Sequence, residues 1–247
     1  MDTPVYGAAP RFFVPGNLSL GAEVDLPERA ARHCNVLRLN RGDAVVLFNG
    51  EGGECVAELS RSSRDRVSAR LLSKRVIERE SPLAVELAQC VPSGDRMDIA
   101  VQKATELGVR RIVPIASERS IVKLSGTRAE RRIEHWRNVA VSACEQCGRN
   151  RVPDVANISD LRAFVSEARG EALRLLLAPE AARELKSIAP PSTVTLLVGP
   201  EGGLSPGERQ DAERCGFLPV RFGPRVLRTE TAPLAAIAAM QALWGDC

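Results

Sequence analysis

The feature that most constrains the fold is an apolar run that ends at a cluster of glycines, within residues 194–208. Residues 194–198 are Val, Thr and Leu without interruption, a pattern typical of a strand buried on both faces of a parallel sheet. A glycine-rich turn follows at 199–203, and residues 205–208 (Ser-Pro-Gly-Glu) have the composition of a capped helix start. The stretch therefore predicts a strand, a short turn and a helix.

A second glycine turn follows at residues 222–232, after another short apolar run. Glycines let the main chain lie against a ligand without interference from Cβ atoms. Ligands in open α/β sheets bind at the carboxyl ends of the strands. Either turn alone would be an ordinary tight turn, but the two together predict a binding site built from main chain.

Composition indicates a soluble protein of one or two domains. The chain has 247 residues, 44% hydrophobic and 26% charged, which is ordinary for a globular protein with a real core. No apolar run approaches the roughly 20 residues that span a bilayer. The N-terminus lacks the basic and then apolar pattern of a signal peptide. We expect a cytoplasmic protein with no membrane partner.

The cysteines predict neither disulfides nor a metal site. There are seven, an odd number, and they are scattered along the chain, which fits reduced thiols in the cytoplasm. Cys144 and Cys147 form a C-x-x-C motif, but no second pair stands at the spacing of a zinc site. We expect no metal.

Basic residues concentrate in residues 119–151, where eight arginines and lysines face three acids. A surface of this charge could bind a polyanion. The alternative is a solvated helix face in a chain that prefers Arg to Lys.

The pattern of elements changes along the chain. Residues 1–73 contain short strands and one helix at 27–37, which predicts a small β-barrel that could serve as a binding module. A charged linker at 74–82 follows, and strands then alternate with helices, as in a parallel sheet covered on both faces. Helices are expected at 95–107, 128–147, 159–168 with Ser159 as its cap, 180–188 and 231–244. The predicted domains are 1–73 and 74–247.

Several separated motifs then match one known family. They are Arg-Phe-Phe at 11–13, residues 33–38 with Gly42-Asp43, Gln-Lys-Ala-Thr-Glu-Leu-Gly-Val at 102–109, Glu-Gln-Cys-Gly-Arg at 145–149 with Val152-Pro153, Gly-Pro-Glu-Gly-Gly at 199–203, and Leu-Arg-Thr-Glu-Thr-Ala at 227–232. In this order they resemble the RsmE family of 16S ribosomal RNA uridine N3-methyltransferases, in the SPOUT superfamily. The resemblance spans essentially the whole chain.

The resemblance implies a PUA-like N-terminal barrel and a SPOUT-type α/β domain whose C-terminal part forms a deep trefoil knot. It also implies S-adenosyl-L-methionine as the methyl donor, the small ribosomal subunit and its 16S rRNA as partner, and a homodimer. In such a dimer the apolar helix at 231–244 would pack against its counterpart.

The residues that we expect at the cofactor site lie in and around the two glycine turns. They are Leu177, Val198, Gly199, Glu201, Gly202, Gly203, Leu218, Gly223, Val226, Leu227, Arg228 and Thr231. Arg228 is the candidate to face charge that develops on uracil, because a guanidinium is always protonated and offers a planar fork of donors. Its alternative is a salt bridge with Glu230 or Glu201. Either carboxylate could accept the proton, or could cap a helix, and solvent could suffice as the acceptor because the N3 proton is fairly acidic.

The residues that we expect to contact RNA come from both parts of the chain. They are Arg11, Arg32 and Arg38 in the N-terminal domain, and Arg119, Lys123, Arg131 and Arg149 in the basic segment. Arg149 could instead interact with the end of the long helix. Two other functions fit the same motifs, namely methylation of a ribose 2′-oxygen and RNA binding by a non-catalytic assembly factor.

Overall fold

A computed structural model describes residues 9–63, 66–120, 126–167 and 170–247, and it divides the chain into two compact units. The first unit runs to Glu80 and also includes Cys144–Val152, and the second comprises Ser81–Ala143 and Pro153–Cys247. The first unit is therefore built from two separate pieces of sequence. Among the described residues, no helix is both long enough and apolar enough to cross a bilayer.

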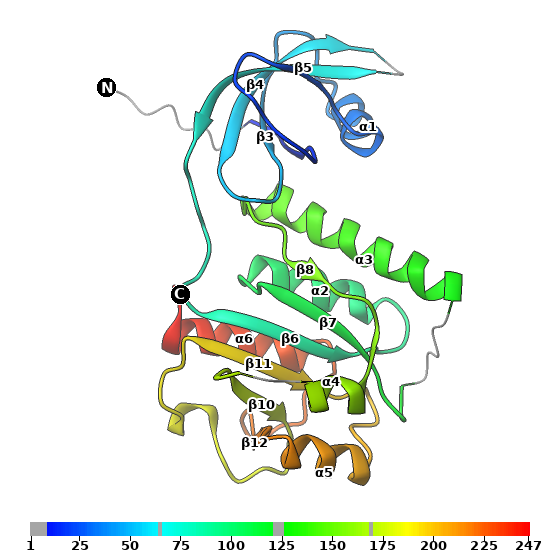
Figure 1. The fold of residues 1–247 in the computed structure, drawn as a ribbon, viewed down its shortest axis with the longest axis vertical. Helices are drawn as coiled ribbons and strands as arrows, with labels where there is room; N and C mark the ends of the chain where they lie inside the picture. Colours follow the sequence, from blue (N-terminus) through cyan, green and yellow to red (C-terminus); the bar gives the residue numbers. More distant parts are fainter. Residues whose placement is uncertain (1–8, 64–65, 121–125, 168–169) are drawn as a thin grey trace. The chain divides into compact units, whose positions relative to one another are not determined.

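The second unit is organised around a parallel sheet, as predicted (Figure 1). Its strands are β6 (Ala84–Cys90), β7 (Arg111–Ala116), β8 (Asp154–Val155), β9 (Ser159–Asp160), β10 (Leu173–Leu177), β11 (Thr193–Val198) and β12 (Leu218–Val220). The order is β12-β10-β11-β6-β7-β8, with β9 also paired to β7, and all pairs are parallel. β10 therefore separates β12 from β11.

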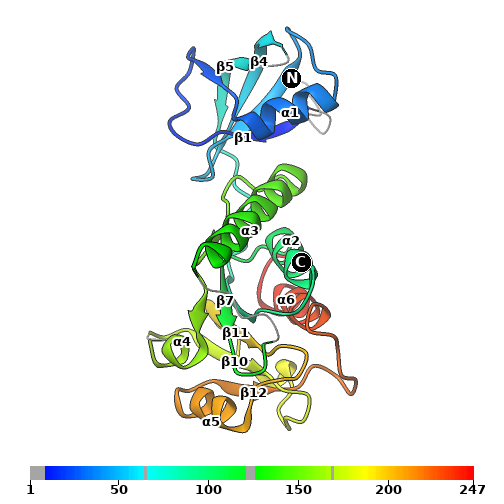
Figure 2. The same ribbon diagram turned by 90° about the vertical axis from the view of Figure 1, so that its right-hand side faces the viewer.

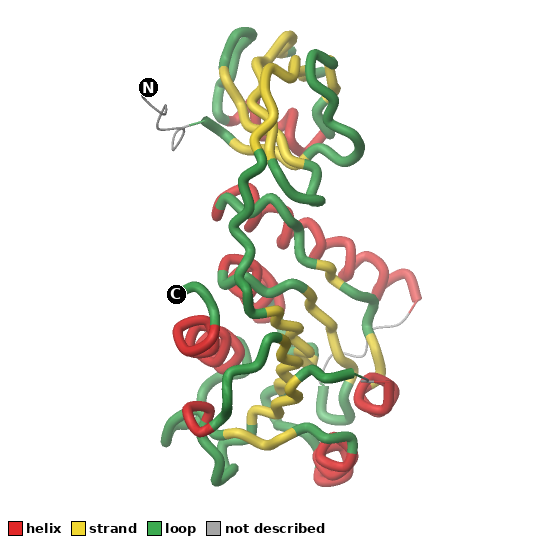
Figure 3. The backbone as a smooth tube through the Cα atoms, turned by 60° about the vertical axis from the view of Figure 1, so that its left-hand side comes forward, coloured by secondary structure: helices red, strands yellow, loops and turns green. Residues whose placement is uncertain are grey.

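Helices cover both faces of this sheet (Figures 2 and 3). They are α2 (Arg96–Glu106), α3 (Gly126–Cys147), α4 (Leu161–Glu167), α5 (Pro206–Arg214) and α6 (Thr231–Trp244). α2 packs with α6 on one side, and α4 packs with α5 on the other. Under α4 and α5, buried side chains such as Ile115, Leu197 and Phe217 form the core. The apolar residues of the strands and one face of each helix thus meet as their spacing predicted.

Two predicted helices differ in the structure. Residues 180–188 form only a 3-10 turn, η1 (Leu185–Ser187), because Glu184 is extended and bridges to Arg221 beside β12. The helix expected from residue 159 begins at Leu161, since Ser159 and Asp160 pair with β7 as β9. Its cap is the Asp160 carboxylate, which accepts hydrogen bonds from the backbone amides of residues 162 and 163.

In its described residues the first unit holds one sheet, the helix α1 and the last turn of α3. The strands are β1 (Arg11–Phe13), β2 (Glu23–Asp25), β3 (Ala44–Phe48), β4 (Glu54–Ser62) and β5 (Val67–Arg75), and the helix is α1 (Glu28–Val36). The sheet order is β1-β3-β4-β5-β2, antiparallel except for β1 with β3. Phe12, Leu47 and Leu59 are fully buried between the sheet and α1. Because β5 continues to Arg75, the charged linker predicted at 74–82 starts later.

A buried carboxylate joins the two sequence pieces of the first unit. Glu54 is 4% exposed and accepts from Arg11 at 2.6 Å, and Arg75 and Arg79 lie 3.7 and 3.5 Å away. Arg11 also donates to the side chain of Asn150 at 2.7 Å. Burial acts to raise the pKa of Glu54, but the hydrogen bond and charge of Arg11 and the charge of Arg79 outweigh it and hold the pKa below its ordinary value.

Replacing Glu54 with Gln should lower the free energy of unfolding of the first unit by about 3 kcal/mol at neutral pH, because three guanidinium groups lose their anion. A lowered folded-state pKa gives stability that is present at neutral pH and is lost as the pH falls through that pKa. The difference from wild type should therefore shrink in acid. Urea denaturation, with hydrogen exchange of the β4 amides, measures both effects.

The matched control is Glu58→Gln, on the exposed side of the same strand, which should leave the urea midpoint unchanged. Equal midpoints for the two variants at pH 7 would contradict a stabilising role of the Glu54 cluster.

Candidate functional site

The two glycine turns lie at the carboxyl edge of the parallel sheet. The first, residues 199–203, follows the end of β11. The second was predicted at 222–232 and is formed by residues 221–230 after β12, because Thr231 and Ala232 already belong to α6. Leu177 ends β10 and is paired in register with Val220. Because β10 lies between β11 and β12, the chain that leaves β12 must pass the end of β10 to approach the first turn.

The side chain of Thr229 joins the two turns. Its hydroxyl donates to the carbonyl of Gly199 at 2.9 Å and accepts from the Gln89 amide of β6 at 3.2 Å. Thr229 is 7% exposed and Gln89 is fully buried. Three segments that are distant in sequence thus meet through one buried hydroxyl, and the second turn does approach the first as predicted.

The first turn needs glycine at two positions. A Cβ on Gly199 would lie 3.3 Å from the main chain of Gly203, and Gly203 itself has a φ of +66°. The helix that follows has the predicted capping box, in which the side chains of Ser205 and Glu208 each accept a hydrogen bond from the backbone amide of the other residue. The turn is therefore held tightly at both ends.

Residues that follow β6 and β7 contact the outer part of this turn. The Glu201 carboxylate accepts from the amide of Ser93 at 2.9 Å, from its hydroxyl at 2.7 Å and from Arg96 at 2.7 Å. Arg119 donates to the carbonyls of Gly202 and Leu204 at 2.9 and 3.3 Å. Partial burial acts to raise the pKa of Glu201, but the hydrogen bonds with Ser93 and the charge of Arg96 hold the pKa below its ordinary value.

The predicted cofactor residues are brought to this edge from four segments. Val198 ends β11, and Gly199, Glu201, Gly202 and Gly203 lie in the first turn. Leu177 ends β10. The second turn holds Gly223, Val226, Leu227 and Arg228, and Thr231 begins α6. Leu218 is the first residue of β12 and so lies two residues below the edge. Val226 is 80% exposed, while Leu177, Leu218 and Leu227 are partly buried.

The two carboxylates near Arg228 are engaged elsewhere. Glu201 binds Arg96, and Glu230 Oε2 lies 3.6 Å from the same guanidinium. Among the described residues, no carboxylate forms an ion pair with Arg228, whose side chain is exposed. The salt bridge considered as the alternative role of Arg228 is therefore not formed.

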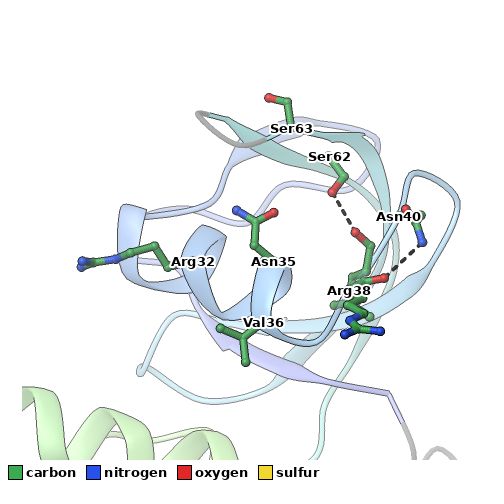
Figure 4. Close-up of a pocket in the computed structure, with 8 residues that line it drawn as sticks. Arg32, Asn35, Val36, Arg38, Asn40, Ser62 and Ser63 are labelled. Atoms are coloured by element: carbon green, nitrogen blue, oxygen red, sulfur yellow. Dashed lines mark hydrogen bonds between the residues drawn. The ribbon is translucent and has the colours of Figure 1, made fainter.

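The N-terminal arginines fall into two groups. Arg32 and Arg38 line a hollow of about 760 Å³ with Asn35, Val36, Leu39, Asn40, Ser62 and Ser63. In Figure 4 Asn35 and Ser62 face the same space, with Arg32 and Arg38 on opposite sides of Asn35. Arg11, in contrast, is bound to Glu54 and Asn150. Of these three arginines, Arg32 and Arg38 are exposed, with Arg32 Nη1 3.8 Å from Glu28 Oε1, whereas Arg11 is partly buried.

The basic segment divides in the same way. Arg149 is 3% exposed, and its guanidinium is paired with Glu80 at 2.6 Å. Arg119 is bound to the first glycine turn. Arg131 is exposed on α3, and Lys123 lies outside the described residues. Removal of a buried, paired arginine would leave the Glu80 carboxylate without its counter-ion, so the geometry of Arg149 favours a structural role.

Sequence reasoning missed Gln89, Ser93 and Arg96. Gln89 carried a signal, because it is a polar side chain within the apolar run that forms β6. Ser93 and Arg96 carried none, because ordinary loop and helix-start residues have the same composition. Within the part of the chain that the structure describes, no group of three or more His, Cys, Asp or Glu could hold a metal ion.

Family models match both parts of the chain. Residues 79–241 match a model described as an RNA methyltransferase domain, and residues 26–72 match an RNA methyltransferase PUA domain. The first match covers the parallel sheet and both glycine turns. Together the two matches define an RNA methyltransferase with an added PUA domain.

Relatives with this domain pair are similar over nearly their full length. Ribosomal RNA small subunit methyltransferase E from Buchnera aphidicola is 30% identical over 96% of this chain and 97% of its own, and that from Bacillus subtilis is 33% identical over 83% and 84%. The Neisseria gonorrhoeae enzyme, solved bound to S-adenosyl methionine, is 46% identical over 96% and 99%, with a TM-score of 0.91. A Legionella pneumophila structure with the same cofactor is 39% identical over 97% and 99%, with a TM-score of 0.94.

This chain belongs to the ribosomal RNA small subunit methyltransferase E family. The resemblance found in the sequence motifs is thereby confirmed.

Replacing Thr229 with Val should lower the free energy of unfolding of the second unit by about 1–3 kcal/mol, because the buried Gln89 amide loses a partner and the two turns lose their link. Thermal denaturation followed by tryptophan fluorescence measures the change, since both tryptophans lie in this unit. Thr193→Val, at an exposed position on β11, is the control and should be neutral. Equal melting temperatures for the two variants would contradict the link.

Proposed function

We propose that this protein transfers a methyl group from S-adenosyl-L-methionine to N3 of a uridine in the 16S rRNA of the small ribosomal subunit. One structural observation carries the proposal. The Thr229 hydroxyl holds two glycine turns together at the carboxyl edge of a parallel sheet, where main-chain groups can bind a ligand. Family membership supports the chemistry.

The residues at this edge fit the cofactor. The space beside Cα is open at Gly203 and Gly223, so a ligand can approach the backbone of both turns. The buried Oε1 of Gln89 has no hydrogen-bond partner among the described residues, which leaves an acceptor where the turns meet. Leu177, Leu218 and Leu227 would supply apolar contacts. When bound, S-adenosylmethionine supplies an electrophilic methyl group on a positively charged sulfur.

Uridine N3 becomes a good nucleophile only as its proton leaves, so negative charge spreads onto O2 and O4 of the base. Arg228 would stabilise this charge, a role supported by its exposed side chain, which forms no ion pair among the described residues. Glu201 and Glu230 are poorly suited to accept the proton, because Arg96 binds both and the pKa of Glu201 is lowered. We assign the N3 proton to solvent.

We propose that the RNA contacts the first unit at the hollow beside α1. Arg32 and Arg38 bring positive charge to its rim, and Asn35 and Ser62 bring donors and acceptors that can read an unpaired base. Arg131, exposed on α3, adds charge for the phosphate backbone. Arg11 and Arg149 are left out of this surface because they are paired within their own unit.

Three further features belong to the same proposal. The C-terminal segment would form the deep trefoil knot, which is supported by the passage of the second turn from β12 across β10 to Gly199. The first unit would curl into the PUA-like barrel. Two copies would pair through α6, where Leu243 is 50% exposed and lies on the same layer as Ile99 of α2, which is 45% exposed. A ribosomal substrate agrees with the cytoplasmic location expected from the sequence.

The test is to incubate the protein with small ribosomal subunits and methyl-labelled S-adenosylmethionine, and then to identify the labelled nucleoside and its position. We expect N3-methyluridine. A 2′-O-methylated nucleoside would show that a different atom is the target. No label together with no cofactor binding in calorimetry would support a non-catalytic assembly factor.

Arg228→Ala should lower kcat for methyl transfer by about 10²- to 10³-fold, the usual effect of removing a donor that faces developing charge. The cofactor dissociation constant should stay within about threefold, because that ligand is held mainly by backbone. Initial rates and calorimetry measure the two quantities. Arg225→Ala, an exposed arginine of the same turn, is the control. Unchanged turnover in Arg228→Ala would remove its catalytic role.

Arg38→Gln should weaken binding of single-stranded rRNA fragments and reduce the slope of log K against log salt by about 0.7, the contribution of one phosphate contact. Arg32→Gln should behave alike. Arg70→Gln, exposed on β5 away from the hollow, should keep the wild-type slope. A slope that falls equally in all three variants would indicate a diffuse electrostatic surface and would contradict binding at the hollow.

A further inference from the structure

Arg96 contacts both glycine turns at their outer rim. Its Nη1 donates to Glu201 Oε1 at 2.7 Å, and its Nε lies 3.6 Å from Glu230 Oε2. Glu201 belongs to the first turn, while Glu230 ends the second and caps α6 without a side-chain hydrogen bond. Arg96 itself begins α2, after β6. One guanidinium therefore bridges two segments that follow different strands.

Several contacts restrict the conformation of the Arg96 and Glu201 side chains. Glu201 Oε1 accepts three hydrogen bonds, two from Ser93 and one from Arg96, and the Ser93 hydroxyl lies 2.6 Å from the same guanidinium. The side chains are 39% exposed for Arg96, 29% for Glu201 and 15% for Glu230. Ion pairs this exposed add little to global stability. The network is better explained by the local geometry that it imposes.

We propose that Arg96 is a positioning residue for the cofactor site, an inference that rests on the proposed function. It sets the separation of the two turns at the rim, while Thr229 joins them at the buried base. Loss of Arg96 should therefore weaken the binding of the methyl donor more than it slows the chemical step.

A matched arginine stands at the opposite edge of the same sheet. Arg111 begins β7 and binds Glu86 at 2.8 Å and Asp154 at 3.0 Å, and its side chain is 49% exposed. It too bridges two carboxylates on different segments, but at the amino ends of the strands. Any effect specific to the cofactor site should therefore appear in Arg96→Gln and be absent from Arg111→Gln.

The experiment compares full-length wild type, Arg96→Gln and Arg111→Gln by calorimetry with S-adenosylmethionine, by methyl-transfer kinetics on small ribosomal subunits and by thermal denaturation. For Arg96→Gln we expect the Kd and KM of S-adenosylmethionine to rise about tenfold or more, with kcat within about threefold. For Arg111→Gln the Kd and the KM of S-adenosylmethionine should stay within about twofold of wild type. The melting temperature should change by a similar small amount in the two variants. A wild-type Kd in Arg96→Gln, or a fall in kcat alone, would overturn the inference.

A mutant cycle tests whether Arg96 acts through the carboxylates. Glu201→Gln and Glu230→Gln should each raise the Kd, and adding Arg96→Gln to the pair should raise it little further, because residues in one network are not additive. Full additivity would contradict the bridge. These two variants also carry the test if Arg96→Gln does not fold. If wild type itself binds no S-adenosylmethionine, the proposed function fails, and that outcome is visible without any variant.

Discussion

The site depends on a hydrogen bond between the Thr229 hydroxyl and the Gly199 carbonyl. In a parallel sheet, turns that follow neighbouring strands lie close together by construction, but β10 separates β11 from β12. The second turn therefore has no strand pairing to hold it against the first, and a side chain must do so. Thr229 fills that role because a hydroxyl can donate to Gly199 and accept from Gln89 at once.

Arginines serve two different purposes in this chain, and net charge does not distinguish them. Arg11, Arg149 and Arg119 are committed to carboxylates or carbonyls of their own units. Arg38 and Arg228 are exposed, and neither forms an ion pair among the described residues. The number of basic residues in a stretch of sequence therefore does not show which guanidinium groups are engaged within the fold and which stay exposed. Here the partners of each guanidinium, and not its position in a basic run, separate the two.

Local sequence signals predicted the elements that local chemistry determines. The capping box at Ser205, the buried strand β11 and the apolar helix α6 formed as expected, because their patterns extend over many residues. The helix expected at 180–188 did not form, since Glu184 bridges to Arg221 across the fold. The places of Gln89 and Arg96 at the site also result from contacts with residues far away in the sequence. Contacts between distant segments leave little trace in a single sequence.

The first unit is assembled from two pieces of chain, and this has a consequence for its biosynthesis. Arg11 and Glu80 find their partners Asn150 and Arg149 only after the chain has produced the strands β6 and β7 and the helices α2 and α3. An N-terminal fragment that stops at residue 80 would keep the pair of Arg11 and Glu54, but it would leave Glu80 without Arg149 and Arg11 without Asn150. During synthesis the apolar core of the first unit, which lies within residues 12–69, is available early, whereas these polar contacts can form only after residue 150 has emerged.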